Sequence, residues 1–309
     1  MSKKRSYKKR KKNKKTVLKK HSVFKQKHCS LKNSHKSDTC LDDRLLIKIG
    51  NILNQYEKSN IIIENSRKRL HKQISDKLSE MSQCNSEKCW LTIQEIISHL
   101  SPEELKLFKD SFKPKKPSEW DKDPNTWLTT SQLKLILEQL EQKYSNFKEY
   151  GALPMDFEKR HQSGCISGDL CNIDLQQHFR DQKHNIGVIF NLDDHDEPGS
   201  HWTAMYVELL PRCREKPSAY YFDSVGSKPP KEIKALVDKL QDQHLSIKGT
   251  QLDFLYNDIQ HQKGNTECGI YALHFLETML KGMDFEKYIK NKNSDKYMEN
   301  FRNYYFIDE

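Results

Sequence analysis

Apolar residues recur at helical spacing in five stretches of the chain. Leucines and isoleucines three and four positions apart give residues 41–53 one apolar stripe, which predicts an amphipathic helix. The same periodicity predicts further helices over residues 91–99, 127–144, 230–240 and 268–280. Predicted helices therefore occur on both sides of the middle of the chain.

Four runs rich in β-branched and aromatic residues predict strands in the second half of the chain. They lie at residues 186–190, 202–209, 219–222 and 251–256, and they alternate with the predicted helices. Alternating strands and helices indicate a domain that combines both kinds of element, for which we use the class α+β.

Charge divides the chain into unequal parts. Residues 1–37 contain sixteen Lys and Arg and no Asp or Glu, whereas the remainder contains 37 basic and 43 acidic residues. A block this dense in like charges repels itself and buries little apolar surface, so we expect a disordered basic tail over residues 1–40. A helical arm and a proline-interrupted linker follow over residues 41–115, and the α+β domain covers residues 116–309.

The composition excludes several protein classes. No run of about 18 apolar residues is present, so no membrane span is expected, and the basic start is not followed by a secretory apolar segment. The eight cysteines have no framework spacing, which predicts reduced thiols in a cytosolic setting.

Four residues have catalytically useful side chains, and three of them fall at the ends of predicted elements. Cys268 opens the last predicted helix, where unpaired N–H groups and the helix dipole favour a thiolate. His201 directly precedes one predicted strand, Asp223 directly follows the next, and Gln262 lies six residues before the cysteine. A thiol hydrolase needs a nucleophile, a base, a carboxylate that orients the base, and an oxyanion donor. Gly269, beside the cysteine, would let a substrate backbone approach closely.

Each of these residues has an ordinary explanation when it is taken alone. A free cysteine is usually a small buried hydrophobe, a histidine before a tryptophan is usually half-buried, and Asp223 suits a turn. The joint order and spacing of Cys268, His201, Asp223 and Gln262 favour the catalytic interpretation. We therefore predict a cysteine-type endopeptidase that needs no metal and no organic cofactor.

The motifs that carry these residues resemble those of a known clan. Three motifs are similar to those of the SUMO-protease and adenain clan of cysteine peptidases: His201-Trp202, the Tyr-Phe-Asp-Ser segment at Asp223, and Gln262 separated by five residues from Cys268-Gly-Ile-Tyr. Within it they most resemble the African swine fever virus type of polyprotein-processing thiol protease found in giant DNA viruses. The resemblance spans roughly residues 120–285 and implies a papain-like or adenain-like core, with a central mixed sheet flanked by helices. Some relatives have Asn in place of Asp223.

A tryptophan motif extends the resemblance. Residues 127–130, Trp-Leu-Thr-Thr, resemble the segment that opens the SUMO-protease domain, where the tryptophan roofs a narrow tunnel that admits only glycine. The resemblance implies that Trp127, Trp202 and Gly269 contact the substrate. A flat indole over the cleft would exclude any Cβ before the scissile bond, whereas the alternative places Trp127 in the core.

The resemblance also implies a biological setting. It implies cleavage after Gly-Gly in a viral structural polyprotein during virion maturation, in the virion and the host cytoplasm, without secretion. The alternatives are a deconjugase of SUMO or ubiquitin-like proteins, an acyltransferase, and a basic nucleic-acid-packaging protein with an inert protease-like domain. Residues 1–37 are basic enough to bind nucleic acid nonspecifically through phosphates.

Overall fold

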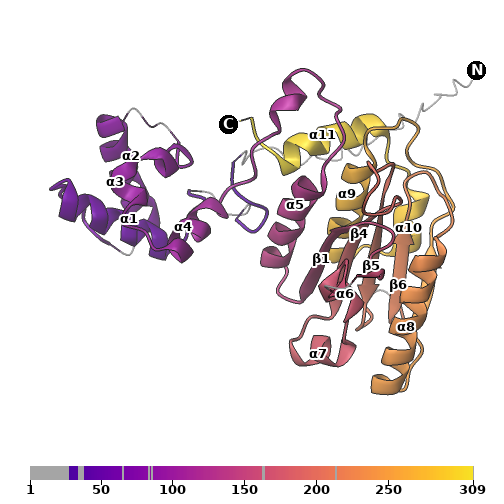
Figure 1. The fold of residues 1–309 in the computed structure, drawn as a ribbon. Coiled ribbons are helices and arrows are strands. Elements are labelled where there is room, and N and C mark those ends of the chain that lie inside the picture. The colour runs from indigo at the N-terminus through magenta and orange to yellow at the C-terminus, as the bar shows by residue number, and fades with distance from the viewer. Residues whose placement is uncertain are drawn as a thin grey trace, which may run out of the picture.

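The structure is a computed structural model that describes residues 28–33, 38–64, 66–82, 84, 86–161, 164–212 and 214–308. Most of the segment that we predict to be a disordered basic tail lies outside these residues. The described residues form a helical arm and a larger α+β domain (Figure 1).

A five-stranded mixed sheet forms the centre of the larger domain (Figure 1). The strand order is β1-β4-β5-β6-β7, in which the outer pairs β1–β4 and β6–β7 are parallel and the inner pairs are antiparallel. The strands are β1 Phe147–Leu153, β4 Asn185–Asn191, β5 Trp202–Glu208, β6 Ser218–Phe222 and β7 Asp253–Tyr256. A separate two-stranded sheet pairs β2 (Arg160–His161) with β3 (Gly164–Cys165).

Helices cover both faces of the sheet, because alternate strand residues enter two different cores. On β5, Ala204 and Tyr206 belong to one core, whereas Met205 and Val207 belong to the other. The first core contains residues of α5 Thr130–Lys143, α9 Cys268–Leu280, α10 Phe285–Lys290 and α11 Asp295–Tyr305. The second contains residues of α6 Gly168–Cys171, α7 Leu175–Arg180 and α8 Lys231–Lys248. The predicted fold class, an α+β core with a mixed sheet flanked by helices, is confirmed.

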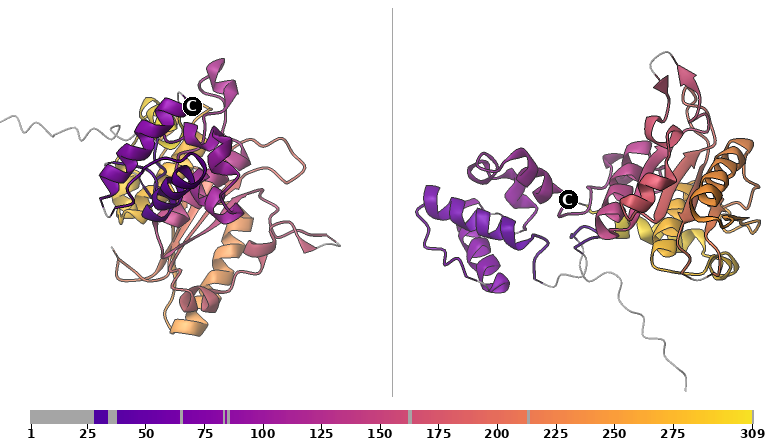
Figure 2. Two further views of the ribbon diagram at one scale, coloured as in Figure 1. Left: turned by 90° about the vertical axis from the view of Figure 1, so that its left-hand side faces the viewer. Right: turned by 90° about the horizontal axis from the view of Figure 1, so that it is seen from below.

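The arm has a hydrophobic core of its own and stands to one side of the larger domain (Figures 1 and 2). It consists of α1 Asp43–Tyr56, α2 Arg67–Ser82, η1 Cys89–Thr92, α3 Gln94–Ile97 and α4 Pro102–Lys109. A further 3-10 turn, η2 Ser118–Asp121, follows the linker. Ser101 caps α4 in a capping box with Glu104, and Pro102 is the first residue of the helix.

One buried glutamine joins the arm to the larger domain. Gln139 of α5 donates from Nε2 to the Phe112 carbonyl at 2.9 Å and accepts from the Leu31 N–H at 3.1 Å. The Lys113 N–H also bonds the His28 carbonyl at 2.9 Å. Residues 28–33, which we assigned to the basic tail, therefore run beside the linker.

The sequence periodicity located most of these elements and misplaced some of them. The helix expected over residues 91–99 is wrong, because η1 and the short α3 replace it. The helix expected from residue 127 begins at Thr130, because Thr129 caps it through a box with Gln132. The elements without a prediction include α2, β1, β2, β3, α6, α7, α10 and α11.

The expectation of reduced cysteines is also wrong for six positions. The pairs Cys29–Cys40, Cys84–Cys89 and Cys165–Cys171 are disulfides, and among the described residues Cys268 is free. The Cα atoms of each pair lie 4.9–6.5 Å apart, which suits a disulfide. The chain bends back locally at each pair, and spacing alone does not reveal such bends.

In the part of the chain that the structure describes, no helix is both long and apolar enough to cross a bilayer.

Gly187 of β4 provides a test of the packing between the sheet and α9. A Cβ at this position would lie 2.6 Å from Cζ of Phe147 and 3.5 Å from Cδ2 of Leu276. Overpacking predicts that Gly187→Ala lowers the free energy of unfolding by about 1–3 kcal/mol. The control is Gly168→Ala, because a Cβ there meets nothing within 4 Å. Denaturant titration of both variants is the measurement, and equal stabilities would contradict the packing.

Candidate functional site

The candidate nucleophile begins the most deeply buried helix of the domain. All residues of α9 are buried, and Cys268 is its first residue, with 1% of its surface exposed. The preceding turn is fixed by Asp295, whose carboxylate accepts from the Lys263 N–H at 3.0 Å and the Gly264 N–H at 2.8 Å. The cysteine therefore sits at a rigid helix N-terminus, as predicted.

Two antiparallel strands bring the candidate base and carboxylate together. His201 lies one residue before β5 and Asp223 one residue after β6. Because the two strands are antiparallel, both residues lie at the same end of the strands. His201 Nε2 lies 2.7 Å from Asp223 Oδ1, and the carboxylate is fully buried. The imidazole of His201 also interacts with the Cys268 side chain. Because Nε2 bonds the carboxylate, Nδ1 is the ring nitrogen that remains for the sulfur.

The neighbours of His201 decide its charge. Burial lowers the pKa of the imidazole, but the hydrogen bonds to Asp223 and Cys268 and the charge of the carboxylate outweigh burial and raise the pKa to about 9. At neutral pH the imidazole is therefore protonated, which is the form that stabilises a neighbouring thiolate.

Two residues that sequence reasoning missed hold Asp223 in place. Asn257 accepts from the Asp223 N–H at 2.8 Å and donates to the Asp223 carbonyl at 2.9 Å. The Val225 N–H donates to Asp223 Oδ1 at 2.9 Å. Asn257 follows β7, the parallel neighbour of β6, so its position at a strand end was the available signal.

Gln262 lies close to this group in a fixed orientation. Its Oε1 accepts from the Ser224 hydroxyl at 2.7 Å, and its Nε2 donates to the Gly264 carbonyl at 3.0 Å. The Gly264 oxygen can only accept, so it fixes which end of the amide carries the hydrogens. The Gln262 N–H also donates to the Ser224 carbonyl at 2.8 Å. Ser224, directly after Asp223, is a further residue that the sequence analysis did not single out.

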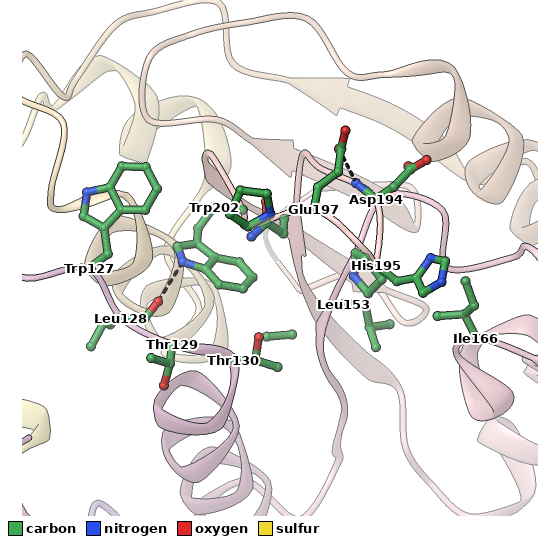
Figure 3. Close-up of a pocket in the computed structure, with 15 residues that line it drawn as sticks. Trp127, Leu128, Thr129, Thr130, Leu153, Ile166, Asp194, His195, Glu197 and Trp202 are labelled. Atoms are coloured by element: carbon green, nitrogen blue, oxygen red, sulfur yellow. Dashed lines mark hydrogen bonds between the residues drawn. The ribbon is translucent and has the colours of Figure 1, made fainter.

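A pocket lies beside Trp202, the residue that follows His201. It has a volume of about 440 Å³, and its lining includes Trp127, Leu128 and Trp202. Figure 3 shows the two indoles at one end of this pocket and the loop that bears His195 and Glu197 towards the other end. Trp202 Nε1 donates to the Leu128 carbonyl at 2.9 Å. This bond ties the start of β5 to the segment before α5, and we call the pair the Leu128–Trp202 wall. Trp127 is 37% exposed, so the alternative of a core tryptophan is wrong.

Gly269 has a packing role in this arrangement. A Cβ on Gly269 would lie 3.1 Å from Cβ of Leu128 and 3.4 Å from Cδ1 of Trp202. The absence of a side chain thus lets the Leu128–Trp202 wall approach α9 closely. The close approach that we expected from a substrate backbone is made here by the protein's own side chains, and a substrate contact at Gly269 stays a prediction.

Metal chemistry was not predicted, and within the described ranges no group of three or more His, Cys, Asp or Glu side chains is arranged to hold a metal ion. The acidic loop beside the pocket, residues 193–197, bonds within itself and to a neighbouring segment, and the Asp194 N–H donates to Oε2 of Glu197 at 3.0 Å. His195 Nδ1, for example, lies 2.7 Å from Oδ2 of Asp156.

Comparisons with known proteins agree with this geometry. A thiol protease of Acanthamoeba polyphaga mimivirus is 29% identical over 292 residues, which cover 88% of this chain and 90% of that protein. A cysteine protease of African swine fever virus is 26% identical over 267 residues, which cover 79% of this chain and 93% of that protein. A second African swine fever virus relative with the same identity and coverage is described as a SUMO-1 cysteine protease.

Comparison of folds again gives the African swine fever virus protease. The crystal structure of the African swine fever virus protease superposes with a TM-score of 0.65 at 21% identity, over 91% of this chain and 96% of that one. Residues 169–309 also match a family model described as YopJ Serine/Threonine acetyltransferase. The relatives over most of the chain are cysteine proteases, and a cysteine beside a histidine–aspartate pair is a site of the cysteine-peptidase kind. The chain is therefore a homologue of the cysteine proteases of African swine fever virus and mimivirus.

Proposed function

We propose that this protein is a thiol endopeptidase that cleaves after Gly-Gly and processes viral structural polyproteins during virion maturation. The observation that carries the proposal is the chain of contacts from Cys268 through His201 to Asp223, at a helix N-terminus beside a tryptophan-walled pocket. The catalytic residues are Cys268, His201, Asp223 and Gln262.

In the proposed reaction His201 starts as an imidazolium beside the Cys268 thiolate. The thiolate attacks the carbonyl carbon of the scissile peptide, and the imidazolium protonates the leaving amine as the C–N bond breaks. The resulting thioester is attacked by water, which gives a proton to the now neutral imidazole, and the acid product leaves as the C–S bond breaks and the thiolate–imidazolium pair re-forms. The buried carboxylate of Asp223 keeps the imidazole oriented through both steps.

Hydrogen bonding to the developing oxyanion is assigned to the side-chain amide of Gln262 and to the backbone N–H of Cys268. The Ser224 hydroxyl and the Gly264 carbonyl hold the amide so that Nε2, not Oε1, is the end available for donation. A fixed donor costs no reorganisation when the negative charge forms, which is why such groups contribute much of the catalysis.

Selection for glycine is assigned to the indoles of Trp127 and Trp202. Both line the pocket, and the bond from Trp202 to the Leu128 carbonyl keeps the wall close to Gly269 at the start of α9. A narrow slot between flat rings would admit a backbone without a Cβ at the two residues before the cut. Gly269 would contribute by allowing this close packing.

The biological assignment rests on the relatives. Viral thiol proteases over most of the chain support action on viral polypeptides, in the virion and the viral factory of the host cytoplasm. The basic residues 1–37 would concentrate the enzyme near the genome through phosphate contacts. The division into a tail, an arm over 41–115 and a catalytic domain over 116–309 belongs to the same proposal.

Two enzymatic alternatives have their own support. The SUMO-1 description of one relative favours a deconjugase, which would cut folded ubiquitin-like conjugates. The acetyltransferase family model over residues 169–309 favours acyl transfer, in which an amine or hydroxyl rather than water accepts the acyl group from the cysteine. A third, non-enzymatic alternative is a nucleic-acid-packaging protein whose cleft is inert.

The specificity test uses peptides. We expect the protein to cut Gly-Gly-Xaa peptides after the second glycine and to leave matched Ala-Ala-Xaa peptides intact, with mass spectrometry as the readout. Cys268→Ala should abolish cutting. Equal cutting of both peptides would contradict the glycine slot, and cutting by the alanine variant would contradict the nucleophile. Cutting of a folded ubiquitin-like fusion alone would favour the deconjugase.

The pH dependence follows from the raised pKa of His201. Because the imidazolium is lost as the pH passes about 9, kcat/KM should hold up to that pH and fall above it. The stabilisation that the imidazolium gains from Asp223 is complete below its unfolded pKa and is lost over the same upper range. Asp223→Asn should move the imidazole titration, followed by NMR, to lower pH. A wild-type midpoint near 6.5 would contradict the assigned contacts.

The oxyanion donor is tested by two truncations. Gln262→Ala should lower kcat by about 10²–10³-fold with little change in KM, because it removes a transition-state donor. Ser224→Ala frees the amide and should lower kcat by about tenfold, the equivalent of one hydrogen bond. Gln241→Ala is the control, since Gln241 also donates from Nε2 to a carbonyl, that of Leu252, but on α8. Unchanged kcat in the Gln262 variant would remove it from the mechanism.

A further inference from the structure

One buried arginine contacts two segments of the candidate site, the one before Trp127 and the one before Cys268. Arg302 of α11 is 3% exposed. Its guanidinium binds the Glu267 carboxylate, with Nε at 3.1 and 3.0 Å from the two oxygens and Nη2 at 2.8 Å from Oε1. It also donates to the carbonyls of Thr126 at 2.7 Å, Thr266 at 3.2 Å and Asn125 at 3.3 Å.

These partners are the immediate neighbours of functional candidates. Residues 125–126 lead directly into Trp127, and residues 266–267 lead directly into Cys268. The two segments are about 140 positions apart in the chain, and a single planar group with fixed donors joins them. A guanidinium suits this task because its donors point in set directions from one rigid plane.

The other face of the arginine is also held. The guanidinium carbon lies 4.6 Å from the centre of the Trp120 ring, and that ring packs edge-on against Phe306 next to α11. Arg302 therefore has packing on its face and hydrogen bonds around its edge. Little freedom remains for it to swing away from the cleft segments.

Stability alone does not explain the buried ion pair between Arg302 and Glu267. Burial raises the pKa of the Glu267 carboxyl, with the hydrogen bond and charge of Arg302 opposing that shift, which is the sign of a real desolvation cost. A buried ion pair often contributes no more to stability than apolar residues of the same volume would. What apolar residues could not supply is the set of directed bonds to three backbone carbonyls.

We propose that Arg302 is a positioning residue that sets the gap between the Trp127 segment and the Cys268 turn, and so makes the site selective for residues without a Cβ. This inference rests on the proposed peptidase function for its selectivity, but the positioning itself does not require a substrate.

A second arginine, which is more exposed than Arg302, makes a similar set of bonds at the other end of α9. Arg212 bonds Glu208 and donates to the carbonyls of Met279 and Leu280, where the helix ends. It thus combines a carboxylate partner with backbone carbonyls, as Arg302 does, but far along the helix from Cys268. Arg212→Lys is therefore the control for Arg302→Lys.

The experiment compares full-length wild type, Arg302→Lys and Arg212→Lys by hydrogen exchange and by peptide cleavage. We expect Arg302→Lys to speed amide exchange in residues 122–129 and 262–268 together, whereas Arg212→Lys does so in neither. The ratio of kcat/KM for Gly-Gly over Gly-Ala peptides should fall by about tenfold in Arg302→Lys alone, because displaced walls admit a Cβ. If Arg302→Lys does not fold, the charge-neutral double variant Glu267→Gln with Arg302→Met replaces it.

The outcomes separate the two claims. Faster exchange in both segments supports the positioning role even when wild type shows no preference for glycine, a result that defeats only the proposed specificity. Unchanged exchange in the two segments overturns the inference, as does a selectivity ratio that stays constant while total activity falls with the folded fraction.

Discussion

The burial of α9 is the constraint on which the rest of the structure depends. Every residue of this helix is buried, with β5 and β4 on one side and α5 and α11 on the other. A helix that must bury its whole surface cannot slide or rotate without exposing apolar area, at about 25 cal/mol per Å². Its first residue, Cys268, is therefore fixed against the ends of β5 and β6, where His201 and Asp223 lie.

The polar part of the site is built on this apolar frame. Asp223, Gln262 and Glu267 are all buried, and each has hydrogen-bond partners that fix its orientation. Buried groups of this kind are costly unless they are paired, so the partners Asn257 and Ser224 are as much a part of the site as the groups they hold. The same frame extends to the cleft walls, because Gly269 leaves room for the Leu128–Trp202 contact.

Much of the fold followed from periodicity, and the exceptions have physical causes. The strands at residues 186–190 and 202–209 were predicted because they are continuous runs rich in β-branched and aromatic residues, and the helix at 268–280 because its apolar residues recur at helical spacing. Strand β1 was missed because it is a sheet edge with polar and partly buried positions, which lack the run of buried residues seen in β4 and β5. Helix α2 was missed because it carries many charges and buries only three residues.

The candidate site was predictable to a similar degree. Cys268, His201 and Asp223 lie at element ends, where the sequence could single them out, and the structure brings these three side chains together. Gln262 lies in the loop before α9 and contacts Ser224. Ser224 and Arg302 act through contacts between segments that are far apart in the chain, and no local pattern marks such contacts. The disulfides were missed for the same reason, since each depends on a local bend of the backbone.

The central claim, that Cys268 is a nucleophile served by His201 behind a glycine-selective cleft, is tested most directly by covalent trapping. A Gly-Gly peptide ending in a vinyl sulfone would be added to the full-length protein, and the intact mass and the labelled residue would be measured. The account predicts one adduct, on Cys268, which His201→Ala slows strongly and which an Ala-Ala probe does not form. Labelling at another residue, or equal labelling by both probes, would contradict it.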